Sequence, residues 1–207
     1  TRMADHPGPV RVSYAARAVR PPSPGKIEGA EQRQAGIELV GADGPAADAE
    51  VIAALTRALA AAGVPDARVA VGSVALVSAV LDGSGADAAT RDALWRALRG
   101  RSVVDWRAAA STIDASGEVR EVVIDLPVLR GGPEVLQRIG AAIPAAADEC
   151  ARLGATLELV GRHGAPPPMV DLGVVRDWAY CSGIVIEAYA SGATAPVAVG
   201  GRYDSLA

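Results

Sequence analysis

The stretch from Val170 to Leu206 constrains the fold of this chain more than any other. It contains three short runs of apolar and β-branched residues, Val170–Val175, Gly183–Tyr189 and Pro196–Val199. Such runs predict β-strands. Ser191 and Gly192, between the second and third runs, are typical of a hairpin turn, which makes those two strands antiparallel. We therefore expect the three strands to lie side by side around one pocket.

A double glycine, Gly200-Gly201, follows the third run and is followed by Arg202, Tyr203 and Asp204. Glycine lets a backbone pass close to another group, and here a cation, a phenol and a carboxylate stand beside it. The alternative is a tight turn with solvated charges, because glycines within strand patterns often mark only bulges. On these residues alone both interpretations stay open.

Two linked motifs in this stretch resemble the histidine-specific motifs of the histidyl-tRNA synthetase family, which includes a non-aminoacylating regulatory subunit of ATP phosphoribosyltransferase. Gly-Gly-Arg-Tyr-Asp-x-Leu spans Gly200–Leu206, and Arg-x-x-x-Tyr-x-x-Gly-x-Val-x-Glu spans Arg176–Glu187. The resemblance implies an α+β fold, a class II aminoacyl-tRNA synthetase-like antiparallel sheet flanked by helices. We expect one such domain over residues 1–207, present as a fragment incomplete at both ends, with a mostly helical stretch at about 86–165.

The N-terminal part resembles the second class II motif, two strands joined by a long loop. Val10–Val19 and Gln32–Val40 have strand patterns, and the prolines between them interrupt regular structure. The resemblance makes Arg20 the remnant motif-2 arginine, which holds the α-phosphate of ATP in the synthetases. An adenylate-forming site needs several fixed cations against a triphosphate, and Glu28 replaces one of them, while Pro22 stands where the synthetases have an acid. The loop therefore argues against aminoacylation.

Gln34 and Glu38 are four residues apart on one of these strands, so their side chains share a face. The resemblance implies that they receive the α-ammonium group of histidine, a role that suits an amide oxygen and a carboxylate. It also implies that Arg176, Tyr180 and Tyr203 contact the imidazole ring and carboxylate of histidine. The alternative for Gln34 and Glu38 is a polar pair on the solvated face of the strand.

The same site departs from the family pattern at Ala179 and Cys181, where an acid and a tyrosine are common. The comparison with the family therefore implies a pocket with reduced affinity for histidine. Cys181 has no histidine near it in sequence, so we do not expect a nucleophile. His6 and His163 lack neighbours at ligand spacing, and we predict exposed side chains and no metal site.

The helical pattern is clearest at Ala46–Ala62, where Val51, Leu55 and Leu59 recur on one face. Trp95 and Trp106 stand at helical spacing and are predicted to be core residues. The remaining expected elements are a strand at Arg68–Ser73 and helices at Val74–Leu81, Ala86–Arg99, Val103–Ala110, Pro133–Ile139 and Pro144–Leu153.

Composition excludes several classes of function. The net charge is −4 and the arginines are scattered among acids, so we expect no nucleic-acid partner. The sequence has no apolar run of about 18 residues and opens without a signal peptide, which predicts a soluble, cytoplasmic protein with no membrane partner. Two cysteines, Cys150 and Cys181, fit a reducing compartment. No cofactor motif occurs.

The leading hypothesis is a non-catalytic regulatory subunit of ATP phosphoribosyltransferase, in the first step of histidine biosynthesis. The resemblance implies a hetero-oligomer with the short catalytic subunit, a self-dimer, and histidine as the effector that inhibits the assembly. Two alternatives stay open: a histidyl-tRNA synthetase with a degenerate ATP loop, and an amino-acid-binding paralogue.

Overall fold

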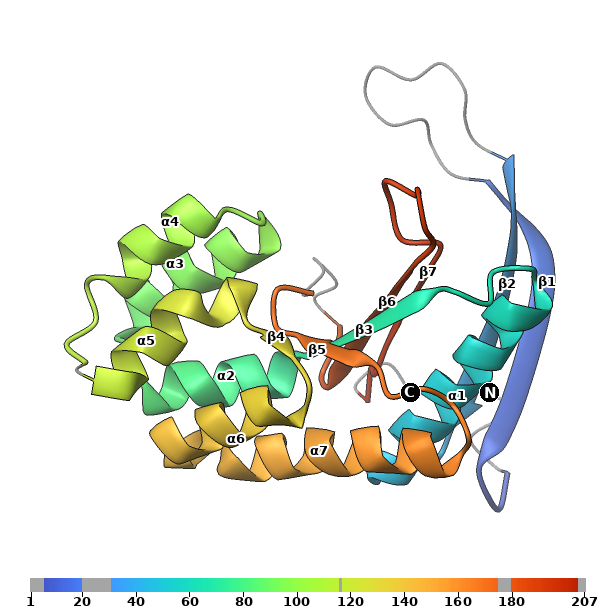
Figure 1. Cartoon of the computed structure of the whole chain (residues 1–207), viewed down its shortest axis with the longest axis horizontal. Helices are drawn as coiled ribbons and strands as arrows, with labels where there is room; N and C mark the ends of the chain where they lie inside the picture. The colour runs from blue at the N-terminus through green and yellow to red at the C-terminus, as the bar shows by residue number, and fades with distance from the viewer. Residues whose placement is uncertain (1–5, 20–30, 116, 175–179, 205–207) are drawn as a thin grey trace.

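Two sheets and seven α-helices make up the part of the chain that this computed structural model describes, residues 6–19, 31–115, 117–174 and 180–204 (Figure 1). The first sheet is a hairpin. Its strands β1 (Val10–Val19) and β2 (Glu31–Val40) pair antiparallel from Val10 opposite Val40 to Val19 opposite Glu31. Both strands were predicted from the sequence, and the structure confirms them.

The second sheet has the strand order β4-β5-β3-β6-β7. Its strands are β3 (Arg68–Ser73), β4 (Arg130–Gly131), β5 (Met169–Asp171), β6 (Ile184–Tyr189) and β7 (Ala198–Gly201). The predicted antiparallel pairing of the last two strands is confirmed. Among the described strands of this sheet, all pairs are antiparallel except β3 with β5.

One expectation about this sheet is wrong, because β5 and β6 are not neighbours. The strand β3 lies between them, with Ala70 to Ser73 all buried, as a central strand requires. The strand β5 is also shorter than predicted. Its Asp171 carboxylate accepts a hydrogen bond from the backbone N–H of Gly173 at 2.9 Å and turns the chain out of the sheet.

The seven helices are α1 (Gly44–Ala61), α2 (Val74–Gly83), α3 (Ala88–Arg99), α4 (Val103–Ala110), α5 (Gly117–Asp125), α6 (Pro133–Ala142) and α7 (Ala147–Arg162). Short 3-10 turns, η1 (Leu126–Val128) and η2 (Pro144–Ala146), precede β4 and α7. The predicted helix that ended at Leu153 instead continues to Arg162. Gly154 does not interrupt it, because Leu157 and Val160 extend its buried face.

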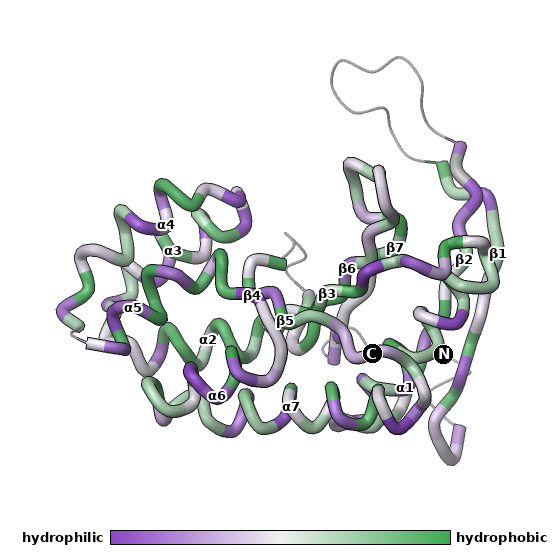
Figure 2. The backbone as a smooth tube through the Cα atoms, in the orientation of Figure 1, coloured by the Kyte–Doolittle hydropathy of each residue, from purple (hydrophilic) through white to green (hydrophobic). Residues whose placement is uncertain are grey.

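The strand β3 runs directly into α2, whose first turn is capped by Ser73. The Ser73 hydroxyl accepts a hydrogen bond from the N–H of Leu76 at 3.1 Å. Figure 2 shows α2 as hydrophobic over most of its length, and in Figure 1 it lies between α3–α5 and α6–α7. The sheet and the helical part of the fold are therefore joined without a loop.

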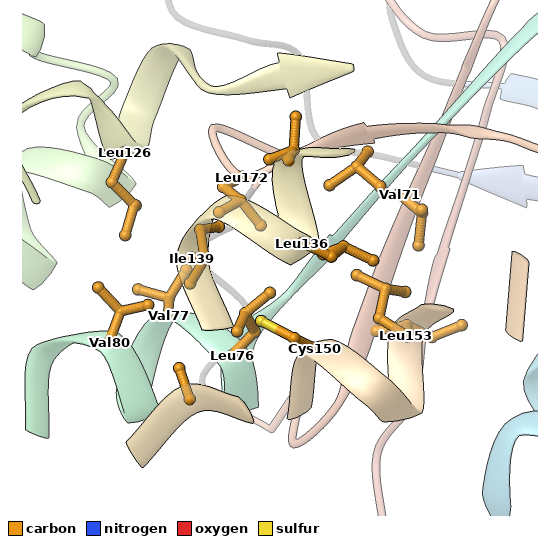
Figure 3. Close-up of a cluster of buried hydrophobic side chains, with 14 of the residues drawn as sticks. Val71, Leu76, Val77, Val80, Leu126, Leu136, Ile139, Cys150, Leu153 and Leu172 are labelled. Carbon is orange, nitrogen blue, oxygen red and sulfur yellow. The ribbon is translucent and has the colours of Figure 1, made fainter. Parts of the chain in front are cut away.

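The main core lies around α2 (Figure 3). Leu76 and Val77 of α2 point toward Ile139 of α6, and Cys150 of α7 lies next to Leu76. Trp106 is fully buried and its indole N–H donates to the carbonyl of Val123 at 2.8 Å, so its predicted core role is confirmed.

The described helices include none with the length and hydrophobicity of a transmembrane span.

Candidate functional site

Three of the predicted site residues meet where the hairpin lies against the end of β7. The Tyr203 hydroxyl donates a hydrogen bond to the carboxylate of Glu38, 165 positions earlier in the sequence. The ring of Tyr180 stands edge-on to that of Tyr203, with centroids 6.0 Å apart and an interplanar angle of 83°. The fold therefore assembles a carboxylate and two phenols from three distant segments.

Gln34 joins this group through Tyr14 of β1, which was not among the predicted site residues. The Gln34 amide donates to the Tyr14 hydroxyl at 2.8 Å. Tyr14 pairs with Gly36, and a Cβ at Gly36 would stand 2.4 Å from the Tyr14 ring. The ring therefore lies over Gly36, between Gln34 and Glu38, because only glycine leaves it room there. We refer to Tyr14, Gln34, Glu38, Tyr180 and Tyr203 as the tyrosine cluster.

The electrostatics of the tyrosine cluster favour a neutral phenol at position 203. Burial and the hydrogen bond to Glu38 raise the pKa of Tyr203 to about 12. The hydroxyl therefore stays protonated at neutral pH and available as a donor. The cluster combines a carboxylate, an amide oxygen and three aromatic rings, which suits a ligand with an ammonium group and a flat ring.

Arg202, the residue before Tyr203, is held on another side by three carboxylates. Its Nη1 donates to Asp48 at 2.9 Å and its Nη2 to Asp43 at 2.6 Å. Its Nε donates to both oxygens of Asp204, at 2.8 and 3.0 Å. The Arg202 side chain is 12% exposed. The alternative of a turn with solvated charges is therefore wrong for Arg202.

These carboxylates differ in their environments. Hydrogen bonds from Arg152 lower the pKa of Asp43, and those from Arg202 lower the pKa of Asp204. Burial raises the pKa of Asp48 despite its ion pair with Arg202. A polar cavity of about 130 Å³ lies among Asp48, Arg152, Arg202 and Asp204. Because these arginines already bind carboxylates, the arrangement is a brace between α1, α7 and β7. We refer to Asp43, Asp48, Arg152, Arg202 and Asp204 as the Arg202 brace.

The expected close approach at the double glycine occurs at Gly201. A Cβ there would stand 3.0 Å from the Cys181 sulfur and 3.2 Å from the carbonyl oxygen of Ile184. Cys181 is buried, and burial raises the pKa of its thiol. A raised pKa disfavours the thiolate, in agreement with the prediction that Cys181 is no nucleophile.

A second buried polar group joins the helical part of the molecule to β6. Glu187 is fully buried, with Arg101 Nη2 at 3.0 Å from its Oε1 and the Tyr189 hydroxyl donating to its Oε2. Arg101, in the turn between α3 and α4, has φ of 53°, which is uncommon for a residue other than glycine. The motif predicted Glu187, but its partner lies 86 positions away in sequence and could not be foreseen.

Two predicted site residues, Arg20 and Arg176, lie outside the described residues. His6 and His163 are exposed, as expected. The described part of the chain has no group of three or more His, Cys, Asp or Glu side chains arranged to hold a metal ion.

Sequence reasoning missed the partners of Arg202, yet one of them left a signal. Asp48 lies one turn before Ile52 on the buried face of α1, where an apolar residue would continue the pattern. A carboxylate at such a position requires a buried partner, and this could have been inferred. Asp43 and Arg152 are exposed and gave no comparable signal.

A model of the family described as histidyl-tRNA synthetase matches residues 1–207. The chain belongs to the histidyl-tRNA synthetase family. It is 36% identical over 201 residues to the ATP phosphoribosyltransferase regulatory subunit of Moorella thermoacetica, covering 96% of this chain and 52% of that protein. It is 40% identical over 176 residues to the protein of that name from Thermus thermophilus, covering 84% and 47%.

A solved structure described as an ATP phosphoribosyltransferase regulatory subunit/histidyl-tRNA synthetase, from Bacillus halodurans C, has the same fold. Its TM-score is 0.84 at 29% sequence identity, over 98% of this chain and 53% of that one. The predicted class II synthetase-like α+β fold is therefore confirmed, with a sheet that is mixed through its one described parallel pair. The chain spans about half the length of the curated relatives it matches.

Proposed function

We propose that this chain is part of a non-catalytic regulatory subunit of ATP phosphoribosyltransferase. The short catalytic subunit would need it for activity, and histidine would inhibit the assembly through it. One contrast carries the proposal. The tyrosine cluster has groups that suit an amino acid, whereas residues 20–30 carry Glu28 in place of one of the cations that an ATP site needs, and Pro22 in place of an acid of the synthetase pattern. The names of the relatives support the same function.

The ligand would be recognised by groups already held in position. The α-ammonium of histidine would be received by Glu38 and Gln34, in exchange for the hydrogen bond that Tyr203 gives Glu38 in the described structure. The rings of Tyr180 and Tyr203 would contact the imidazole, and Arg176 would receive the carboxylate. No chemical step follows from this binding, because the proposed role is to shift an equilibrium between more and less active states of the assembly.

The test is ATP phosphoribosyltransferase activity of the short catalytic subunit with and without the full-length protein, and then with added histidine. The proposal expects activity only in the mixture, and its suppression by histidine. An inactive mixture whose components elute separately would contradict it. Histidine-dependent ATP–pyrophosphate exchange by the full-length protein alone would instead establish a synthetase.

A matched pair of variants tests the ligand site. Glu38→Gln removes the charge that would bind the ammonium group, whereas Glu158→Gln removes an exposed charge on α7 that pairs only with Arg162 among the described residues. Loss of a charge-assisted hydrogen bond costs about 1.5–3 kcal/mol, so the histidine concentration for half inhibition should rise about 10- to 100-fold in Glu38→Gln. The Glu158→Gln protein should respond to histidine as the wild type does.

A further inference from the structure

We propose that Asp48 is a positioning residue, which holds Arg202 and thereby orients Tyr203 toward Glu38 and Tyr180 for recognition of histidine. This inference rests on the function proposed above. Asp48 belongs to α1 and touches none of the tyrosine cluster in the contacts found among the described residues. Its action on the ligand would be indirect, through the segment that follows β7.

Arg202 is fixed through both its main chain and its side chain. Its N–H donates to the carbonyl of Ile184, and its own carbonyl accepts from the N–H of Ser182, each at 2.9 Å. A guanidinium group is planar and rigid, so three carboxylates around its edge leave it one orientation. The position and the direction of the backbone that leads into Tyr203 are therefore both fixed at Arg202.

Tyr203 itself lies beyond the end of β7 at Gly201, so no ladder pairing orients it. It stands between two anchored residues instead. Arg202 is one, and the other is Asp204. The Asp204 carboxylate accepts a hydrogen bond from the Ser182 hydroxyl at 2.6 Å, and the Asp204 N–H donates to the oxygen of that hydroxyl at 3.1 Å. The orientation of Tyr203 therefore depends on the Arg202 brace.

Asp48 is the member of the brace with the greatest effect on Arg202. Its side chain is 6% exposed, against 78% for Asp43 and 55% for Asp204, so solvent screens its attraction for Arg202 least. The charges that face it are those of Arg202, Arg152 and Asp204. Burial raises its pKa, which means that folding alone does not favour the ionised carboxylate. A carboxylate at that position is better explained by orientation than by stability.

The test uses the full-length protein and the matched pair Asp48→Asn and Asp66→Asn, the second in an exposed turn. Histidine affinity is measured by calorimetry and stability by urea unfolding at pH 7. We expect Asp48→Asn to bind histidine about tenfold more weakly without a lower urea midpoint, and Asp66→Asn to match the wild type. Arg202→Lys keeps the charge but not the three-sided contact, and should weaken binding in the same direction.

Unchanged histidine affinity in Asp48→Asn would overturn the proposal, as would a parallel fall in affinity and stability, which indicates a merely structural role. A second readout does not depend on histidine. In protein labelled with 3-fluorotyrosine, the fluorine resonance of Tyr203 is identified by its loss in Tyr203→Phe. If the wild-type protein binds no histidine, the proposed function fails, and a shifted or broadened Tyr203 signal in Asp48→Asn still supports the positioning role. An identical signal overturns it.

Discussion

The apolar core around α2 and the Arg202 brace at the end of β7 hold the same fold together by different physics. In the core, side chains such as Leu76 and Ile139 are fully buried and contribute through the area they remove from water, without a required direction. In the brace, one planar guanidinium donates directional hydrogen bonds to three carboxylates. The comparison teaches that stability and orientation are supplied by separate parts of this molecule.

The largest effect should follow from damage to the core. Leu76→Ala removes a fully buried side chain and leaves a cavity, so we expect a loss of about 2–5 kcal/mol in the free energy of unfolding. Urea unfolding of the intact protein measures it. Val104→Ala, at a side chain 78% exposed, should change stability by less than about 0.5 kcal/mol. Equal effects of the two variants would contradict this description of the core.

The ion pair between Arg101 and Glu187 tests a case between the two regions, since one partner is fully buried and the other more than half exposed. Arg101→Ala removes the guanidinium that pairs with the buried Glu187 carboxylate, and should cost about 1–3 kcal/mol in the free energy of unfolding. Arg101→Gly should cost about 1 kcal/mol less than Arg101→Ala, because glycine adopts the positive φ at this position without strain. Urea unfolding of both variants measures the difference; no difference would mean that the backbone there is unstrained.

Within the brace, two carboxylates should contribute to stability with opposite dependences on pH. The pKa of Asp48 is raised, so its stabilising contribution is present below the unfolded-state value near 3.9 and is lost as the pH rises through its folded pKa. The pKa of Asp204 is lowered, so its contribution is present above about 3.9 and is lost as the pH falls. From pH 4 to 7, Asp48→Asn should gain stability relative to the wild type.

The check on that prediction is urea unfolding of both variants between pH 3 and 7. The disadvantage of Asp204→Asn relative to the wild type should shrink as the pH falls below 4. Parallel pH profiles for Asp48→Asn and the wild type would show that the buried carboxylate does not titrate as described.

The smallest effect concerns the two cysteines, Cys150 in the core around α2 and Cys181 beside the end of β7. Burial raises the pKa of Cys150 to about 11, so about one thiol in a thousand is ionised at pH 8. Burial also raises the pKa of Cys181, which lies against Gly201. We expect iodoacetamide to alkylate both thiols slowly in the native protein and fast in urea. Mass spectrometry of the two cysteine-containing peptides measures the extent of alkylation. Fast native labelling at Cys150 would contradict its burial.

The sequence was a good guide to the core and a partial guide to the site. Periodicity predicted α1 and the hairpin strands because each depends on neighbours along the chain. The motifs predicted Glu38 and Tyr203, and the structure brings them into contact. Their ligand role stays a prediction. The central position of β3 and the pairing of Asp48 with Arg202 depend on contacts between distant segments, which no local pattern encodes.

Gly36 has a consequence for comparisons between sequences. Any side chain at that position would occupy the space of the Tyr14 ring. A glycine between Gln34 and Glu38 therefore indicates that an aromatic ring lies between the two polar groups. A homologue with the glutamine and the glutamate but a larger residue between them should have lost that cover. The residue at position 36 therefore separates relatives with this aromatic cover from relatives without it, a distinction that the two polar residues alone do not make.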